Sequence, residues 1–346
     1  MCGLARLELS LRSCRLGAGG MRRFAREVQK LQGLTRLKLD MSFNDLGDVG
    51  VRELSYAVTA LPGLETLGLD LNRNYIGDAG VGWLAQGVAT LVNLTDFQLV
   101  LFDNQVCQSG VRELANAVRA LREPARLALG LNRNAISEAG VQDLAHAAGT
   151  HHSLKDLQLS LSISSVGWAG AHDLAMALGG LHGLRTLVLD LNVNHIGAAG
   201  ARLLAQALGS LRHLASLCYL ASGNRMGDVG VKELSQGVAS LLCLSSLELD
   251  LSGNSLGDAG AWELGCAVAA LRGLARLVLD LRGNAIGEAG AKEFARVAGG
   301  LAALESFELH LDGNVRGAGR GLHSQHELAL MVQRLQAGGC ACECTW

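Results

Sequence analysis

Hydrophobic residues recur along the chain with a fixed period of 30 residues. In one repeat, Leu187, Leu189 and Leu191 alternate with other residues, which is the period of a strand with one buried face. Later in the same repeat, Ala201 and Leu204 begin a series of apolar residues spaced three to four positions apart, as in an amphipathic helix. Each repeat is therefore predicted to form a strand, a turn, a helix and a return to the next strand.

The turn between strand and helix carries two recurring residues, an asparagine and a glycine. The glycine recurs every 30 residues from Gly20 to Gly290, and Asn44 begins a column of asparagines that only Ser164 interrupts before Asn314. An asparagine amide can satisfy backbone groups that lack a partner in the turn, and such a group costs ~1–3 kcal/mol when it is buried and unpaired. Some turns also contain an aspartate suited to capping a helix or to interacting with its positive end. These residues are Asp48, Asp78, Asp228 and Asp258.

The repeats are predicted to stack, because a single strand and helix cannot bury its own apolar face. Parallel strands lie ~4.8 Å apart and helices are ~10 Å wide, so the stack should curve with its helices on the outside. The predicted fold is an α/β, right-handed, curved solenoid or horseshoe, with a parallel sheet on its concave side and α-helices on its convex side. Eleven strands are expected within residues 1–322, a C-terminal capping helix at 323–337 and a flexible, cysteine-rich tail at 338–346.

The repeat motif L-x-x-L-x-L-x-L-x-x-N-x-I-G-x-x-G-x-x-x-L resembles the leucine-rich repeat superfamily, and within it the ribonuclease-inhibitor-like class. The repeats of that class pair a strand with a full α-helix. This chain departs from the class by having 30 residues per repeat rather than 28 or 29. The resemblance implies protein–protein binding, but the family includes inhibitors, immune sensors, ubiquitin-ligase adaptors and activators of small GTPases. Fold alone does not choose among these functions.

Composition narrows the class of protein further. The 346 residues are 49% apolar but only 4% aromatic, and 32 acidic against 30 basic residues give a net charge of −2. That balance argues against a strongly basic nucleic-acid binder. Neither a secretory leader nor an apolar stretch of membrane-spanning length is recognisable. The nine cysteines are unevenly distributed, which favours a reducing compartment: the cytoplasm, with the nucleus as an alternative.

Sequence motifs for catalysis or metal binding are not recognisable, so we expect neither an enzyme nor a cofactor. Cys340, Cys342 and Cys344 lie near His323 and His326, but their spacing lacks the usual two-to-four-residue gap between zinc ligands. The C-terminal cysteines are therefore predicted to be thiols of the tail, and no metal site is expected.

Departures from the repeat mark candidate contact residues. Tyr219 takes the place of a leucine, and Leu220 follows at a position that should point outward. Val100 and Phe102 likewise put apolar side chains where the strand should face solvent. His151 replaces a repeat-defining leucine and is expected to be solvated. These departures have two interpretations. They are sequence changes that a repeat array tolerates because its repeats share stability, or they form an apolar contact site on the concave face.

Acidic residues recur at outward strand positions as well. One column contains five aspartates, and a second column two residues earlier contains Glu248 together with Glu8 and Glu308. Arginines at positions 36, 126 and 276 share this face, so its charge is mixed. The aspartates are either copied with each repeat or used for binding, and the pattern alone leaves both readings open. The aspartates are Asp40, Asp70, Asp190, Asp250 and Asp280.

The sequence therefore predicts a non-enzymatic scaffold that binds another protein, with a basic surface, through the concave sheet face. Neither nucleic acid nor a membrane is an expected partner. One alternative is a regulator of a small GTPase, because the repeat class is similar to that of the Ran GTPase activators. Another is the sensor array of a larger immune-type receptor. The predicted partner-binding residues are Asp40, Asp70, Val100, Phe102, Asp190, Tyr219, Leu220, Glu248, Asp250 and Asp280.

Overall fold

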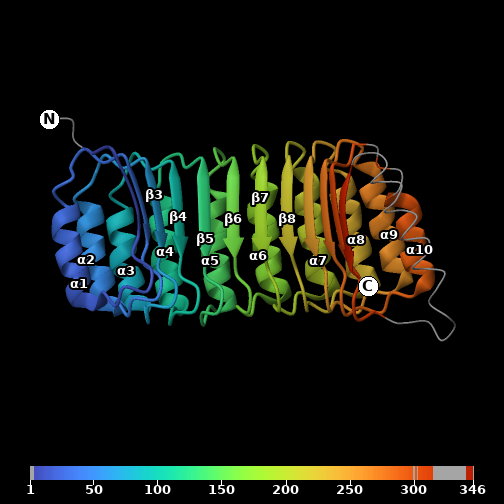
Figure 1. Ribbon diagram of the computed structural model, residues 1–346, viewed down its shortest axis with the longest axis horizontal. Coiled ribbons are helices and arrows are strands. Elements are labelled where there is room, and N and C mark those ends of the chain that lie inside the picture. The colour runs from blue at the N-terminus through green and yellow to red at the C-terminus, as the bar shows by residue number, and fades with distance from the viewer. Residues whose placement is uncertain (1–3, 299–300, 302, 315–339, 346) are drawn as a thin grey trace. The chain divides into compact units, whose positions relative to one another are not determined.

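The computed structural model describes residues 4–298, 301, 303–314 and 340–345. Contacts divide the chain into two compact units, Met1–Ser165 and Val166–Trp346. Both units alternate strands and helices from one end to the other, coloured blue to green in the first unit and green to red in the second (Figure 1). We describe each unit separately.

In the first unit, strands pair in parallel in chain order, and each residue lies opposite the residue 30 positions further along. Leu37 lies opposite Leu67, for example, so a column in the sequence becomes a row across the sheet. The elements are β1 (Arg6–Ser10), α1 (Gly17–Val28), β2 (Arg36–Asp40), α2 (Gly47–Thr59), β3 (Thr66–Asp70), α3 (Asp78–Val88), β4 (Asp96–Val100), α4 (Gln108–Ala120), β5 (Arg126–Gly130), α5 (Glu138–Gly149) and β6 (Asp156–Ser160).

The second unit repeats this arrangement. Its strands also pair in parallel, and each residue from β7 to β11 again lies opposite the residue 30 positions away, whereas Ala341 of the last strand lies opposite Ser306. The predicted alternation of strand and helix in a parallel solenoid is confirmed in each unit. The elements are α6 (Gly167–Gly179), β7 (Thr186–Asp190), α7 (Gly197–Ser210), β8 (Ser216–Leu220), α8 (Gly227–Ala239), β9 (Ser246–Asp250), α9 (Asp258–Ala270), β10 (Arg276–Asp280), α10 (Glu288–Ala298), β11 (Ser306–His310) and β12 (Ala341–Thr345).

The core of each unit lies between its strands and its helices. Leu37 and Leu39 of β2 are buried, as are Leu54 and Val58 of α2, in agreement with the period change in the sequence. Figure 1 shows the helices of each unit stacked along one face of its strands. The other face carries the alternate strand residues, most of them half-buried. We call this side the sheet face.

The recurring asparagines join adjacent repeats, as their predicted role requires. The Oδ1 atom of Asn74 accepts hydrogen bonds from the backbone N–H groups of Asn44 (3.0 Å) and Leu46 (3.3 Å), one repeat earlier. Its Nδ2 atom donates to the carbonyl oxygens of Met41 (2.9 Å) and Asn72 (3.1 Å). Asn74 is fully buried, so these bonds pair backbone groups that water does not reach.

The aspartates at the helix starts cap the next helix rather than their own. The Oδ1 atom of Asp48 in α2 accepts hydrogen bonds from the N–H groups of Gly77 (2.7 Å) and Gly80 (3.0 Å), at the start of α3. Asp228 does the same for the start of α9. A Cβ atom on Gly80 would lie 2.6 Å from this carboxylate oxygen, which explains the glycine at that position. The predicted capping is confirmed, but it acts between repeats.

Two expectations from the sequence are wrong. Residues 341–345 are not a flexible tail: they form β12, which pairs in parallel with β11. Without that pairing, an edge strand such as β11 would leave backbone N–H and C=O groups without partners. His151 is also not solvated, because it is buried and its Nε2 atom lies 2.8 Å from the carbonyl oxygen of Val118. The predicted capping helix at 323–337 lies outside the described residues.

Candidate protein-interaction surface

On the sheet face of the second unit, an apolar side chain lies between two carboxylates. The strand register places Leu220 at the end of β8 directly between Asp190 of β7 and Asp250 of β9. All three side chains are half-buried. Two residues earlier in β8, Cys218 lies beside Glu248 in the same way. The structure therefore brings Leu220 together with three of the predicted acidic residues.

The acidic residues of this face are partly neutralised by arginines. Arg276 forms ion pairs with Glu248 (3.4 Å) and Glu308 (3.6 Å), and Arg282 pairs with Asp280. Burial opposes ionisation of Asp280, but hydrogen bonds from Arg282 outweigh it and hold the pKa of this carboxyl below its ordinary value. Asp190 and Asp250 flank Leu220. The face is thus mixed in charge, as the sequence indicated.

Cys218 lies in the middle of this face and stays protonated. Burial, reinforced by the negative charges of Glu248 and Asp190, raises the pKa of its thiol to about 12. Because a thiolate is the nucleophilic form of cysteine, Cys218 is a weak nucleophile near neutral pH.

The aspartates at the strand ends also have a structural role, which the sequence pattern did not reveal. The Oδ1 atoms of Asp190 and Asp250 accept hydrogen bonds from the backbone N–H groups two residues later, at 3.1 and 3.0 Å. After Leu220, which has no such oxygen, the corresponding N–H of Ser222 donates to Asn192 of the preceding repeat (2.6 Å). Part of the aspartate column is therefore explained by turn formation. An Asp→Asn change would remove the charge and keep the accepting oxygen.

Tyr219 does not belong to the surface, so its prediction as a contact residue is wrong. It is fully buried, and the register aligns it with Leu189 and Leu249, which point into the core. Alternation along β8 explains the error, because neighbours in a strand point to opposite faces. Burial also raises the pKa of the Tyr219 hydroxyl.

The buried hydroxyl of Tyr219 leads to a stability prediction. It has no hydrogen-bond partner among the described residues. Because an unpaired buried hydroxyl costs ~1–3 kcal/mol, Tyr219→Phe should raise the free energy of unfolding by about 1 kcal/mol, measured by urea denaturation. Tyr56→Phe is the matched control, since Tyr56 is 56% exposed and its hydroxyl reaches water. A loss of stability in Tyr219→Phe would contradict the prediction.

The sheet face of the first unit holds three more predicted residues around a hollow of about 440 Å³. Asp40, Asp70 and Val100 line it, together with Gly68 and Lys38. Burial raises the pKa of Asp70, and the neighbouring charge of Asp40 adds to this effect. Burial also acts to raise the pKa of Asp40. Hydrogen bonds from Ser42 and Ser10 outweigh burial there, so the pKa of the Asp40 carboxyl is lower than its ordinary value.

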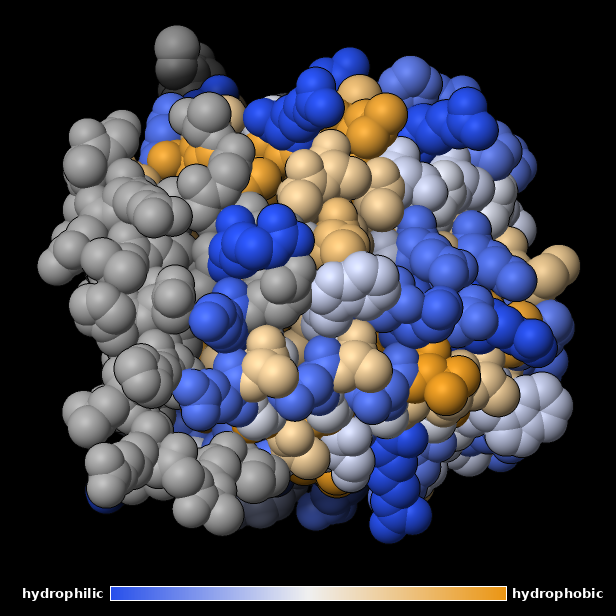
Figure 2. Space-filling view, turned by 90° about the vertical axis from the view of Figure 1, so that its right-hand side faces the viewer, coloured by the Kyte–Doolittle hydropathy of each residue, from blue (hydrophilic) through white to orange (hydrophobic). Residues whose placement is uncertain are grey.

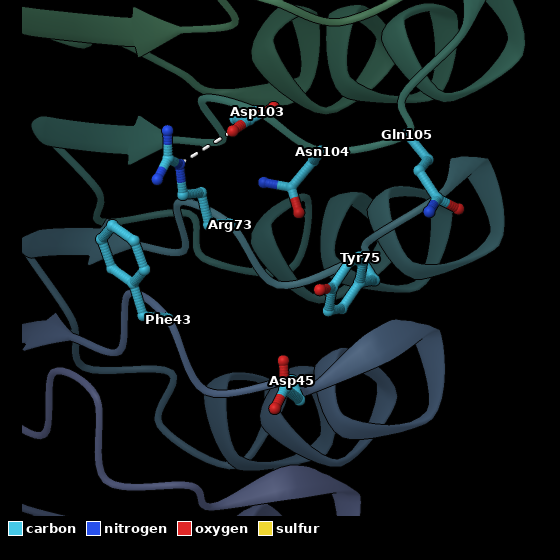
Figure 3. A pocket seen from close by; sticks show the side chains of 7 residues that line it. All are labelled: Phe43, Asp45, Arg73, Tyr75, Asp103, Asn104 and Gln105. Atoms are coloured by element: carbon cyan, nitrogen blue, oxygen red, sulfur yellow. Dashed lines mark ion pairs between the residues drawn. The ribbon is translucent and has the colours of Figure 1, made fainter.

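Phe102 lies beyond the end of β4, in the loop, and so apart from the other predicted residues. Its ring centre lies 5.8 Å from the guanidinium carbon of Arg73. Arg73 in turn lines a second hollow of about 570 Å³, together with Phe43, Tyr75 and Asp103. Figure 3 shows Arg73 between Phe43 and Asp103, with its ion pair to Asp103. The sequence interpretation missed this cluster.

Apolar side chains are exposed on the helix side as well, but singly. Trp262 of α9 is 46% exposed and Met176 of α6 is 66% exposed. Lys232 of α8 pairs with Glu263 of α9 at 2.9 Å, which is typical of a solvated helix surface. In Figure 2, which views the molecule from the side where α9 and α10 lie, hydrophilic residues separate small hydrophobic groups on the coloured surface.

Within the described part of the chain, no three His, Cys, Asp or Glu side chains are placed to hold a metal ion together. His323 and His326, near which no metal site was expected, lie outside that part. Of the helices that the structure describes, none combines the length and the apolar character needed to cross a bilayer.

Comparison with known proteins finds a repeat family in three segments of the chain. Residues 37–55, 244–265 and 277–295 match the family model described as Leucine Rich repeat. These matches support the leucine-rich repeat superfamily. No curated protein matches the chain. Among solved structures, the chain is similar to one from the Rad7 and Elc1 complex in yeast, with 16% sequence identity, a TM-score of 0.49, and coverage of 91% of this chain and 79% of that one.

Proposed function

We propose that this protein is a non-enzymatic scaffold that binds a protein with a basic surface through the sheet face of its second unit. The observation that supports this function best is Leu220, half-buried between the carboxylates of Asp190 and Asp250. An apolar side chain surrounded by charge is a common arrangement at the centre of an interface. The acidic neighbours would chiefly raise the association rate with a basic partner.

Leu220→Ser is expected to weaken partner binding at least tenfold without unfolding the protein. Serine already occupies this strand-end position in β1 and β6, as Ser10 and Ser160, and the turn bond from Ser222 to Asn192 does not involve Leu220. The change therefore removes the apolar contact and little else. Partners captured from a native lysate would be quantified by mass spectrometry, and circular dichroism would verify the fold.

Two further variants make this test specific. Leu242→Ser removes a leucine that is 68% exposed in the loop after α8, and it should retain every partner. The double variant Asp190→Asn and Asp250→Asn keeps the accepting oxygens of the turns, and should slow association and reduce its dependence on salt. If Leu220→Ser retained every partner while Leu242→Ser lost them, the binding site would lie at the loops that follow the helices, and the sheet-face proposal would be wrong.

We further propose the ribonuclease-inhibitor-like class and a cytoplasmic location. Helices of 11 to 14 residues between successive strands from α1 to α10 support the class. Free thiols support the location, because exposed cysteines persist in reducing compartments. Those exposed in the described residues are Cys14, Cys107, Cys243 and Cys266.

A further inference from the structure

Arginines and phenylalanines alternate along the loop edge of the first unit. The guanidinium carbon of Arg12 lies 4.7 Å from the centre of the Phe43 ring, and that of Arg73 lies 5.2 Å from the same ring. Arg73 is also 5.8 Å from the Phe102 ring, and Arg133 is 5.4 Å from it. We call these five residues the arginine–phenylalanine ladder. It spans five consecutive repeats.

The backbone at three positions of the ladder is strained, which indicates that the side chains themselves matter. Phe43, Arg73 and Arg133 have φ angles of +59°, +51° and +53°, a left-handed conformation that favours glycine. In the second unit the same repeat position is glycine four times, with the same sign of φ. The first unit therefore keeps large side chains where glycine would fold more easily. The glycines are Gly223, Gly253, Gly283 and Gly313.

The guanidinium groups of the ladder retain free hydrogen-bond donors. The Nε atom of Arg73 forms the ion pair with Asp103 (2.8 Å), so the two terminal NH₂ groups remain available to a ligand. The side chain of Arg73 is 45% exposed. Among the described residues, the side chains of Arg12 and Arg133 form no hydrogen bond or ion pair, although the charge of Arg12 also acts on Asp40 and helps to lower the pKa of that carboxyl. A guanidinium stacked on a ring presents its N–H edge outward in a plane suited to a carboxylate. The ladder thus offers three carboxylate-binding edges.

The spacing of these edges defines the ligand. Backbone hydrogen bonds join the loops of successive repeats, such as Phe43 N–H to Asn72 O (2.9 Å) and Arg73 N–H to Phe102 O (2.9 Å), so the loops keep the strand spacing. The three arginines occur in every second repeat and are thus ~10 Å apart. In a polyproline II helix, every third side chain lies on the same side, ~9.3 Å apart.

We propose that the arginine–phenylalanine ladder binds an acidic peptide segment in polyproline II conformation, with a glutamate or aspartate at every third position. Each carboxylate pairs with one arginine, and the intervening residues contact the edges of Phe43 and Phe102. This site is distinct from the proposed sheet face in both position and charge. A single-stranded nucleic acid fits less well, since two arginines already lie 4.7–5.8 Å from the centre of each ring and bases need open rings for stacking.

The test uses the full chain and synthetic nonapeptides in isothermal titration calorimetry. The probe is (Glu-Pro-Pro)₃, in which proline favours the required conformation. We expect it to bind at least tenfold more tightly than (Gln-Pro-Pro)₃, which lacks the charge. We expect the same advantage over Glu-Glu-Glu followed by six prolines, which has the same composition and charge but a different spacing.

Variants connect this binding to the ladder. Arg73→Gly with Arg133→Gly should weaken binding of (Glu-Pro-Pro)₃ at least tenfold while leaving Tm unchanged or higher, because glycine relieves the left-handed strain. Arg73→Gln with Arg133→Gln should lose binding equally. Arg112→Gln with Arg122→Gln, at two exposed arginines in α4 and in the loop after it, is the charge-matched control and should bind within twofold of the parent. Equal binding of the clustered-glutamate peptide, retention of binding in the arginine variants, or displacement of the peptide by an equal concentration of octauridylate would overturn the proposal.

Discussion

Deletion of residues 246–275 is expected to leave a folded protein that is one repeat shorter. Ser245 would then join Arg276, and Leu277 would take the position of Leu247 in the sheet. The bonds between repeats would re-form with equivalent partners. The N–H groups of Gly287 and Gly290 now donate to Asp258, as those of Gly257 and Gly260 donate to Asp228, so Asp228 would replace the deleted Asp258. The total free energy of unfolding should fall only by the contribution of one repeat and one interface between repeats.

Deletion of residues 246–260 alone should instead abolish cooperative unfolding. The segment from Ala261 to Gly265, now helical, would be forced into the strand position, and the apolar residues of strand and helix would no longer face the same core. Circular dichroism during urea denaturation measures the difference, with the 30-residue deletion as the control. A half-repeat variant that unfolds as cooperatively as the parent would refute the 30-residue unit.

The second large effect is expected from Asn224→Leu. The Oδ1 atom of Asn224 accepts from the N–H groups of Asn194 (3.1 Å) and Ile196 (3.2 Å), and its Nδ2 atom donates to the carbonyl of Leu191 (2.8 Å). The side chain is fully buried, so leucine would leave three backbone groups without these partners. At ~1–3 kcal/mol for each group, the loss should be about 3 kcal/mol or more, measured by urea denaturation.

A milder substitution and a surface control test the cause of this loss. Asn224→Ser should cost less than the leucine variant, since Ser164 occupies the same column and donates to the carbonyl of Ser162. Asn116→Leu changes an exposed asparagine of α4 that accepts a hydrogen bond from Arg119, and it should shift stability by no more than ~0.5 kcal/mol. Equal losses at positions 224 and 116 would show that burial of the amide is not the reason.

Most of the fold could be predicted because one period governs both the strand and the helix of each repeat. Leu187 and Leu189 are buried, and the outward positions of Leu220, Asp190 and Asp250 follow from the same alternation. That alternation also assigns Tyr219 to the core, so a stricter use of the pattern would have removed it from the contact residues.

Other features depend on contacts that a single repeat does not contain. The hydrogen bond that the N–H of Ser252 donates to Asp250 depends on the backbone geometry of the turn, which the sequence pattern does not give. The pairing of β12 with β11 places Ala341 opposite Ser306, which breaks the 30-residue register, and β12 lacks the repeat motif. The arginine–phenylalanine ladder could have been found from the sequence, because glycine gives way to large residues in one column of the first unit. Phe43 and Arg73 lie in that column.

The side-chain hydrogen bonds between repeats matter for the order in which the repeats are completed during synthesis. Asp48 stabilises the helix start of the repeat that follows it, whereas the asparagine of each repeat, such as Asn74, satisfies the turn of the repeat before it. A repeat leaving the ribosome therefore finds the cap for its helix already made, but its own turn stays incomplete until the next asparagine emerges. A chain whose synthesis pauses after one repeat would therefore leave the turn of that repeat without its asparagine partner.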